Sequence, residues 1–191
     1  DGTLFDHAYD PLLAIFGQMH EGEVSTKLGM KGIPNLSEEI AVHRNLEILK
    51  YAGGKLHLQT ISTKGAVDKI REAKKEGLNV TADVSLYQLL FSDEDMASFD
   101  TNLKVMPPFR GKEDRKALIK GLKDGTIDAI VSNHQPQDFD SKFAEFDLAA
   151  FGMAAGKTPF AMDYALRCTE YQLCVSGIPV CRFCSALSES K

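Results

Sequence analysis

The sequence predicts an α/β protein built from consecutive βα units. Three apolar segments each follow a helical segment after a glycine, at Gly53, Gly77 and Gly125. Helices that alternate in this way with buried strands are typical of a parallel sheet, because parallel strands need a crossover connection between them. The 191 residues hold about four such units, whereas a complete eightfold βα barrel usually takes ~250 residues. We therefore predict roughly half of a barrel.

The first part of the chain is expected to supply one strand and one long helix. Residues 3–6 form the predicted strand. Residues 35–52 form the predicted helix, with Asn35 or Ser37 capping its start and Gly53 ending it. Its apolar residues recur at i, i+4 and i+7, as one face of a helix requires, and they are Val42, Leu46 and Leu49.

Three strands and two helices are expected to follow in alternation. The strands cover residues 56–61, 78–84 and 127–131; one helix starts after a cap at Ser62 or Thr63 and ends at Gly77, and the other covers residues 112–123. A period of two identifies the middle strand, and its apolar residues are Leu78, Val80, Ala82 and Val84. Polar residues follow the strands, at the end where a βα barrel carries its active face.

Composition and charge exclude several classes of function. The chain has 22 Lys and Arg against 27 Asp and Glu, so it lacks the basic excess that a general nucleic-acid binder needs. Its charged segment over residues 69–76 is interpreted as a solvated helix face. No run of ~20 apolar residues predicts a membrane span, and no leader opens the chain, so we expect a cytoplasmic protein. Because the chain begins at Asp1 in a partly apolar stretch, we expect further sequence upstream.

Residues 161–191 are expected to form an atypical tail, distinct from the barrel portion over residues 1–160. All four cysteines lie within it, at positions 168, 174, 181 and 184. Three interpretations remain open: an altered reading frame, reduced cysteines in an ordinary tail, and one structural zinc site. Structural zinc sites usually have two close cysteine pairs, and here only Cys181 and Cys184 are closely spaced.

Two segments after the first strand carry histidine and glycine. His7 lies among carboxylates at a strand end, where histidine can ligate zinc, although a surface or core histidine is the simpler interpretation of this pattern alone. The glycines of residues 19–34 suit a structured loop with special backbone angles. Within this loop His20 is interpreted as structural, and His43 as a surface residue of the long helix.

Four segments together resemble dihydroorotase. They are residues 7–39, 56–63, 104–110 and 124–136, in the order and spacing of that family. Dihydroorotases of this type are members of the amidohydrolase superfamily related to allantoinases and dihydropyrimidinases. The resemblance covers residues 1–160 and implies the C-terminal half, about strands five to eight, of a metal-dependent hydrolase barrel of the TIM type. It also implies two zinc ions and a small-molecule substrate, with interconversion of carbamoyl aspartate and dihydroorotate in pyrimidine biosynthesis.

The resemblance assigns metal and catalytic roles to three positions, two of which are substituted. His7 matches a metal-ligand histidine of the family, although Tyr9 stands where the family has Glu. Thr60 replaces the metal-ligand histidine of a His-x-Ser-Thr motif, and His57 should face the opposite way in an extended strand. Asn133 replaces the Asp of an Asp-His-x-Pro motif that carries the catalytic proton. A neutral hydroxyl is a weak zinc ligand and an amide accepts no proton at neutral pH, so neither substituted residue is expected to function.

The resemblance also assigns substrate contacts, some of them altered. His134 matches a histidine that binds a substrate carboxylate, with a solvent-facing loop histidine as the alternative. Met106 stands where the family's Lys-x-Asn-Pro-Pro-Leu-Arg loop has Asn, and Arg110 is the arginine that ends this loop. Residues 86–88 (Leu-Tyr-Gln) replace a segment that contains histidine in the family.

Three hypotheses for function follow from this pattern. The first is a dihydroorotase-like cyclic amidohydrolase whose activity is impaired or absent because of Thr60 and Asn133. The second is a non-catalytic homologue that serves as a scaffold or partner, for example of aspartate transcarbamoylase. The third is a half-barrel with no independent function, for which self-association is expected because paired halves would cover the open sheet edges.

Overall fold

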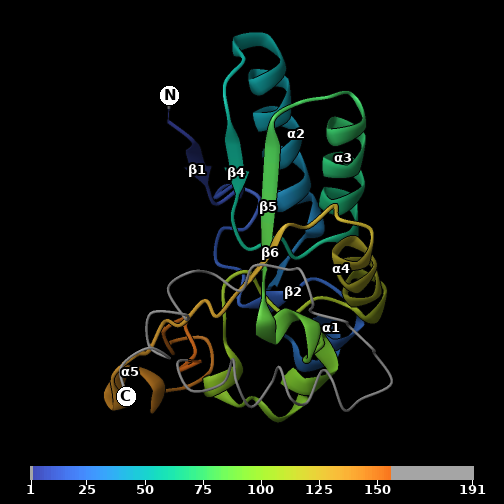
Figure 1. Ribbon diagram of the computed structural model, residues 1–191. Coiled ribbons are helices and arrows are strands. Elements are labelled where there is room, and N and C mark those ends of the chain that lie inside the picture. The colour runs from blue at the N-terminus through green and yellow to red at the C-terminus, as the bar shows by residue number, and fades with distance from the viewer. Residues whose placement is uncertain (1, 156–191) are drawn as a thin grey trace.

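A computed structural model describes residues 2–155, in which a four-stranded parallel sheet is the central element (Figure 1). The strands lie in the order β1-β4-β5-β6 and comprise β1 (Leu4–Asp6), β4 (Leu56–Leu58), β5 (Val80–Ser85) and β6 (Ala129–Val131). Leu4 pairs with Leu56, which in turn pairs with Val80. All three pairings are parallel, so the strands end on the same side of the sheet, as the sequence predicts.

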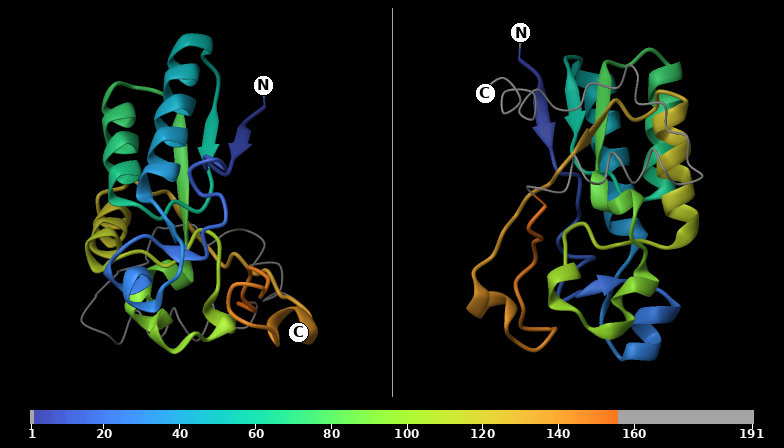
Figure 2. Two further views of the ribbon diagram at one scale, coloured as in Figure 1. Left: turned by 180° about the vertical axis from the view of Figure 1, so that it is seen from behind. Right: turned by 60° about the horizontal axis from the view of Figure 1, so that its bottom comes forward.

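Three helices connect these strands and cover one face of the sheet (Figure 2). They are α2 (Asn35–Ala52), α3 (Lys64–Lys75) and α4 (Lys112–Lys123). The main hydrophobic core lies between the sheet and these helices, with Leu58, Ile70 and Val84 fully buried. Burial of this apolar face holds the helices against the strands.

A smaller layer lies beyond the ends of the strands and has its own core. It contains the parallel pair β2 (Met19–His20) and β3 (Gly32–Ile33), helix α1 (Glu23–Leu28), the 3-10 helices η1 (Leu86–Leu89), η2 (Asp93–Ser98) and η3 (Thr101–Leu103), and helix α5 (Phe139–Lys142). Met19, Tyr87 and Phe109 are at the centre of this second core. Residues 19–34, predicted to form a structured loop, therefore form β2, α1 and β3 of this layer.

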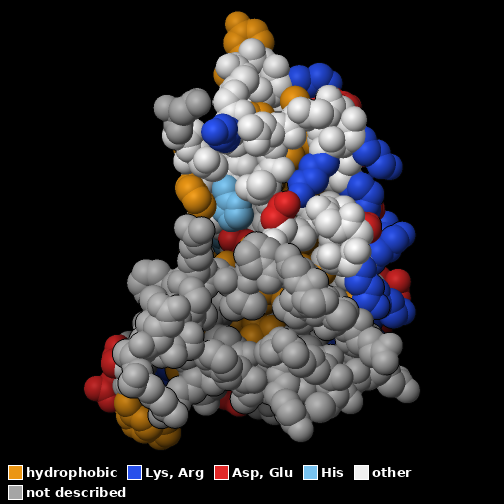
Figure 3. Space-filling view, in the orientation of Figure 1, with side chains coloured by type: hydrophobic (Ala, Val, Ile, Leu, Met, Phe, Trp, Pro, Cys, Tyr) orange, Lys and Arg blue, Asp and Glu red, His pale blue; other side chains and the backbone are white. Residues whose placement is uncertain are grey.

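Basic side chains gather along the side of the molecule formed by α3 and α4 (Figure 3). Several of them form ion pairs with neighbouring carboxylates: Lys64 and Arg71 with Asp68, Lys74 with Asp128, and Lys116 with Glu113. Such exposed pairs contribute little to stability, and they agree with the interpretation of residues 69–76 as a solvated helix face.

The strands are shorter than predicted or displaced by one or two residues. The strand expected over residues 56–61 ends at Leu58, because Thr60 has a positive φ of 49° that leaves the extended conformation. The strand expected over residues 78–84 begins at Val80 and continues to Ser85. The strand expected over residues 127–131 begins at Ala129.

The predicted caps of the first two helices have different outcomes. Thr63 caps α3, since its hydroxyl accepts a hydrogen bond from the backbone N–H of Ala66 at 3.2 Å. The prediction that Asn35 or Ser37 caps α2 is wrong, because the helix begins at Asn35 itself, after Pro34. Ser37 instead donates its hydroxyl to the carbonyl of Asp10 at 3.0 Å.

The cysteine-containing tail predicted over residues 161–191 lies outside the described residues. Within residues 2–155, no helix is both long enough and apolar enough to cross a membrane.

Leu58→Ala should destabilise the fold strongly, because Leu58 is 0% exposed between the sheet and its helices. Truncation of a buried leucine leaves a cavity and typically costs about 2–5 kcal/mol. Leu36→Ala is the matched control, since Leu36 is 51% exposed on α2. Urea unfolding should show a large loss for the first variant and little change for the control; equal losses would contradict this description of the core.

Candidate functional site

Four of the predicted site residues line one pocket, and three of them lie just after the carboxyl ends of strands. His7 follows β1, Thr60 lies two residues after β4, and Asn133 lies two residues after β6. The pocket has a volume of about 350 Å³, and its other lining residues are Gln59, Met106 and Gln135. Tertiary structure thus brings together His7, Thr60, Met106 and Asn133, as the motifs predict.

Thr60 is hydrogen-bonded to the one histidine in this pocket. Its hydroxyl lies 2.7 Å from Nδ1 of His7. The backbone N–H of Thr60 donates to Oδ1 of Asp83 at 2.7 Å, and this contact fixes the residue in its positive-φ conformation. Thr60 is buried whereas His7 is exposed. Nδ1 of His7 is therefore engaged by a neutral hydroxyl.

Asn133 is held by hydrogen bonds on both ends of its amide. Its NH₂ group donates to the hydroxyl of Tyr87 and to the carbonyl of Met106, the latter at 3.3 Å. Its Oδ1 accepts from the side chain of Gln135 at 2.9 Å. Asn133, like Thr60, has a positive φ, of 43°. The side chain is positioned as a donor to its neighbours and offers no site that accepts a proton at neutral pH.

Residues 86–88, which stand where the family has a segment with histidine, have structural roles in this chain, as Tyr87 illustrates. Its ring is 2% exposed and packs edge-on against Phe109, with 5.6 Å between ring centroids. Burial raises the pKa of Tyr87 to about 12, although its hydrogen bond with Asn133 acts in the opposite direction. Gln88, also buried, donates to the carbonyls of Pro107 and Pro108 at 2.8 and 3.1 Å. The segment is therefore buried, with Leu86 in the main core and Tyr87 in the second.

His57 does not line the pocket, in agreement with the prediction that it faces away from Thr60. Its Nε2 lies 2.9 Å from Oδ2 of Asp83, and its Nδ1 lies 2.7 Å from the hydroxyl of Thr81. Asp83 therefore joins His57 to the backbone of Thr60. Asp83 was not among the predicted site residues, and the sequence signal for it is a carboxylate inside a predicted strand.

A second residue missed by the sequence analysis, Glu38, organises the loop that carries Thr60. Its carboxylate is 4% exposed and accepts hydrogen bonds from the backbone N–H groups of Ser62 and Thr63, both at 2.9 Å, and from both hydroxyls. The contacts tie the start of α2 to the start of α3 through the loop after β4. The sequence signal was an acidic residue four positions before Val42, in line with the apolar face of the predicted helix.

Arg110 belongs to this buried network and does not line the pocket. It is 3% exposed; its Nε donates to the Ser62 hydroxyl at 3.1 Å and its Nη1 to the carbonyl of Ile33 at 2.7 Å. Burial lowers the pKa of the Arg110 guanidinium, while the carboxylates of Glu38 and Asp114 act to raise it. Arg110 thus lies apart from the pocket that contains His7, Thr60 and Asn133, and its role in substrate binding stays a prediction.

His20 lies beside Arg110 and is affected by its charge. The two side chains approach to 3.3 Å, between Nη1 of Arg110 and Nδ1 of His20. Burial and the Arg110 charge lower the pKa of His20 to about 4, and Asp114 opposes them. The structural role predicted for His20 fits this position. His134, by contrast, is exposed and is not among the pocket-lining residues.

The pocket residues do not fit a zinc ion. They offer one imidazole, one hydroxyl, one thioether and three carboxamides, whereas zinc in proteins is held mainly by cysteine, histidine and carboxylate ligands. Within residues 2–155, no group of three His, Cys, Asp or Glu side chains could hold a metal ion. The described residues therefore supply no zinc site by themselves.

Comparison with solved structures defines the class of this fold. The L-hydantoinase (dihydropyrimidinase) from Arthrobacter aurescens matches with a TM-score of 0.72 at 23% identity, over 84% of this chain and 37% of that one. A dihydroorotase from Saccharomyces cerevisiae, in complex with 5-fluoroorotic acid, matches with a TM-score of 0.65 at 18% identity, over 86% of this chain and 44% of that one. The chain thus has the α/β fold of part of a TIM-type amidohydrolase barrel.

Sequence comparison identifies the particular relatives. The chain is 45% identical over 162 residues to the dihydroorotase of Thermoanaerobacter sp. (strain X514), and 42% identical over 166 residues to that of Syntrophus aciditrophicus (strain SB). These alignments cover 85% and 87% of this chain but only 38% and 39% of those proteins. No family model matches the chain. The resemblance to dihydroorotase is confirmed, for a chain that spans less than half the length of these curated relatives.

His20→Asn should remove part of the acid sensitivity of folding. Because the pKa of His20 is about 4 in the folded state and ~6.5 in the unfolded state, the unfolded chain binds the proton first. Stability should be highest above pH ~6.5 and fall as the pH drops toward 4, by about 2–3 kcal/mol from this residue. The free energy of unfolding, measured from pH 7 to pH 4.5, should fall less in His20→Asn. His43→Asn, at an exposed position on α2, should follow the unmodified chain; identical profiles for both variants would contradict the assignment.

Glu38→Gln should destabilise the loop after β4. The neutral amide keeps the size of the side chain but loses the charge-assisted hydrogen bonds to residues 62 and 63 and leaves Arg110 less compensated. We expect a loss of about 1.5–3 kcal/mol in the free energy of unfolding. The matched control is Glu47→Gln, which changes an exposed carboxylate on the same helix and should be neutral.

Proposed function

We propose that this chain is a dihydroorotase-like member of the cyclic amidohydrolases in which ring hydrolysis is impaired or absent. The reaction in question is the interconversion of carbamoyl aspartate and dihydroorotate in pyrimidine biosynthesis. The identity to dihydroorotases over 85% of the chain supports the reaction class. The residues of the pocket support the impairment.

The observation that carries this proposal is the arrangement of Asn133. Hydrolysis of a cyclic amide needs a group that accepts a proton from water, and loss of such a base typically costs ~10²–10⁴-fold in rate. Asn133 occupies the position expected of that base, yet its amide donates to Tyr87 and Met106. The surrounding side chains are arranged around an amide, so the substitution is accommodated by its neighbours.

Thr60 is a second position in this pocket where the side chain differs from the one that the resemblance implies. Where the resemblance implies an imidazole, the side chain is a hydroxyl bonded to His7. His7, Thr60 and the carboxamides of Gln59, Asn133 and Gln135 form a polar surface without a carboxylate. Such a surface can donate and accept hydrogen bonds to the amide groups of a small cyclic ligand, but it supplies neither a carboxylate base nor a set of zinc ligands.

The scaffold function is the second candidate, and the buried framework favours it. The network of Glu38, Ser62, Thr63 and Arg110 is complete even though two pocket residues have changed. A chain whose buried network is intact, and whose residue 133 is not a base, could still bind another protein. Aspartate transcarbamoylase is the partner we would test by titration in the analytical ultracentrifuge.

Zinc content and hydrolysis together test the proposal. The full chain, purified without chelator, should hold much less than one zinc per chain by elemental mass spectrometry and should not hydrolyse dihydroorotate above a buffer blank. The double variant Thr60→His/Asn133→Asp should raise the zinc content, because it places a second imidazole and a carboxylate around the pocket of His7.

Matched substitutions at exposed positions provide the control for this test. Thr26→His/Asn102→Asp makes the same chemical changes away from the pocket and should leave the zinc content unchanged. About two zinc ions per unmodified chain, together with dihydroorotate hydrolysis, would refute the proposed impairment. Zinc uptake without hydrolysis in the double variant would show that the loss extends beyond Thr60 and Asn133.

A further inference from the structure

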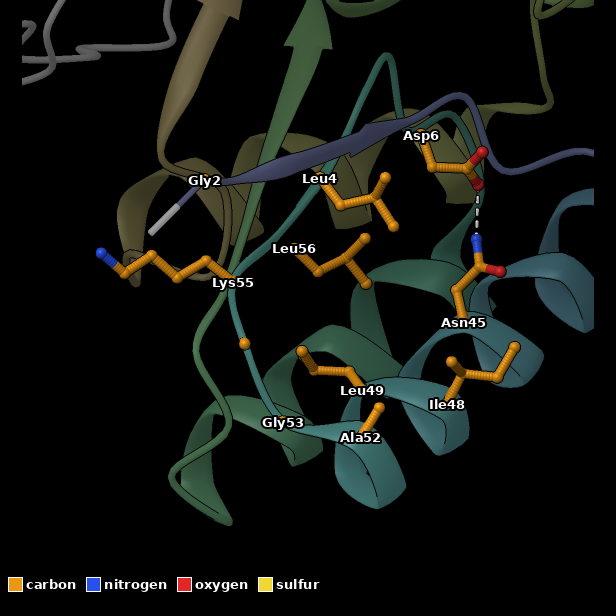
Figure 4. A pocket seen from close by; sticks show the side chains of 11 residues that line it. Gly2, Leu4, Asp6, Asn45, Ile48, Leu49, Ala52, Gly53, Lys55 and Leu56 are labelled. Atoms are coloured by element: carbon orange, nitrogen blue, oxygen red, sulfur yellow. Dashed lines mark hydrogen bonds between the residues drawn. The ribbon is translucent and has the colours of Figure 1, made fainter.

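His7 is held next to Thr60 by contacts of the residues that precede each of them. The backbone N–H of Gln59 donates to the carbonyl of Asp6 at 2.9 Å, so the segments just after β1 and β4 lie side by side. The side chain of Asn45 on α2 donates to the carboxylate of Asp6, as Figure 4 shows. The backbone is therefore fixed immediately before both members of the His7–Thr60 pair.

Thr60 is fixed in addition by a buried carboxylate that has a second partner. Oδ1 of Asp83 accepts the backbone N–H of Thr60 at 2.7 Å, and its Oδ2 lies 2.9 Å from Nε2 of His57. Asp83 is 4% exposed. A β-branched side chain is stiff about its first torsion. Because the backbone of Thr60 is held, the direction of its hydroxyl is restricted as well.

The hydroxyl of Thr60 decides which nitrogen of His7 carries the proton. Within residues 2–155, Nδ1 of His7 is its one hydrogen-bond partner, at 2.7 Å. A hydroxyl has one proton to donate, and a buried donor without an acceptor is costly, so the proton is directed at the lone pair of Nδ1. The hydrogen bond at one ring nitrogen sets the state of the other. In the neutral imidazole of His7 the proton therefore lies on Nε2.

We propose that the pocket binds the carbonyl oxygen of a small cyclic amide through the Nε2–H of His7, and that the Thr60 hydroxyl fixes His7 in the required tautomer. His7 lines the pocket, and with Nδ1 engaged its Nε2 is the ring nitrogen left to contact a ligand. An imidazole N–H is a donor, as a carbonyl oxygen requires. The inference rests on the proposed function, because it takes His7 to be free of zinc, and it names the ligand group that this residue recognises.

The other polar groups of the pocket complement the N–H of such an amide. Gln59 and Gln135 line the same pocket, and a carboxamide offers both a donor and an acceptor. Nε2 of Gln135 donates to Oδ1 of Asn133 at 2.9 Å, which leaves Oε1 of Gln135 to accept from a ligand. The thioether of Met106 supplies an apolar contact. A ring in which a carbonyl adjoins an N–H can thus be bound through both groups.

Nitrogen-15 NMR of histidine-labelled full chain tests the tautomer. At pH ~8, where imidazoles are mostly neutral, the ring correlations of His7 should place the proton on Nε2; the variant His7→Asn identifies these resonances. Thr60→Val removes the hydroxyl at similar size and should give a mixture of both tautomers. Thr60→Ser keeps the hydroxyl and should keep the original signature. A proton on Nδ1 in the unmodified chain, or an unchanged signature in Thr60→Val, would overturn the proposal.

Calorimetric titration with dihydroorotate, whose ring contains amide groups, tests the binding. The dissociation constant should rise about tenfold in Thr60→Val, as loss of one oriented hydrogen bond predicts, and should change little in Thr60→Ser. Thr26→Val is the matched control, because it removes a hydroxyl at an exposed position away from the pocket. Absence of binding to the unmodified chain, or equal affinities of Thr60→Val and Thr60→Ser, would overturn the proposal.

Zinc content and turnover of the same samples separate this inference from the proposed function. Hydrolysis of dihydroorotate by a zinc-loaded, unmodified chain would refute the proposed function, and the inference with it. An inert, zinc-free chain with the proton of His7 on Nδ1 would refute the inference alone. Circular dichroism of each variant shows that the compared chains are folded.

Discussion

The carboxylate of Glu38 is the contact on which the arrangement of the candidate site depends. It lies in the first turn of α2 and receives the backbone N–H groups and hydroxyls of Ser62 and Thr63. Those residues connect β4 to α3, so one buried charge fixes both the start of a helix and the loop that presents Thr60. Arg110 compensates this charge through the Ser62 hydroxyl. A buried carboxylate is tolerated only when it is satisfied in this way.

The pocket rests on this framework but has a different chemical character. Thr60 and Asn133 both adopt positive φ, and each is held by specific partners, Asp83 for the first and Tyr87 for the second. Strained backbone of this kind is maintained only where surrounding contacts determine it. The backbone of both loops is therefore fixed by specific contacts, while Thr60 and Asn133 present a hydroxyl and an amide to the pocket.

The outer strands of the parallel sheet impose a further constraint on the fold. Parallel sheets are normally buried on both faces and closed or covered at their edges. Here the helices cover one face, and β1 and β6 are the outer strands of the described part of the chain. The exposed side chains of Leu4 and Ile48 lie beside one of these edges. The same strands that place His7 and Asn133 at the pocket are thus the outer strands of the described sheet.

The sequence alone determined the alternation of strands and helices and the parallel sheet, because these follow from local periodicity and the connections it requires. The resemblance to dihydroorotase implied that His7, Thr60, Met106 and Asn133 belong to one site. Tertiary structure decided the burial of Glu38 and Arg110, the contact of Asp83 with Thr60, and the short strand ends. These depend on partners far apart in the chain, such as Glu38 with Ser62 and Ile33 with Arg110. Residue type and spacing carry no information about which distant group will satisfy a buried charge.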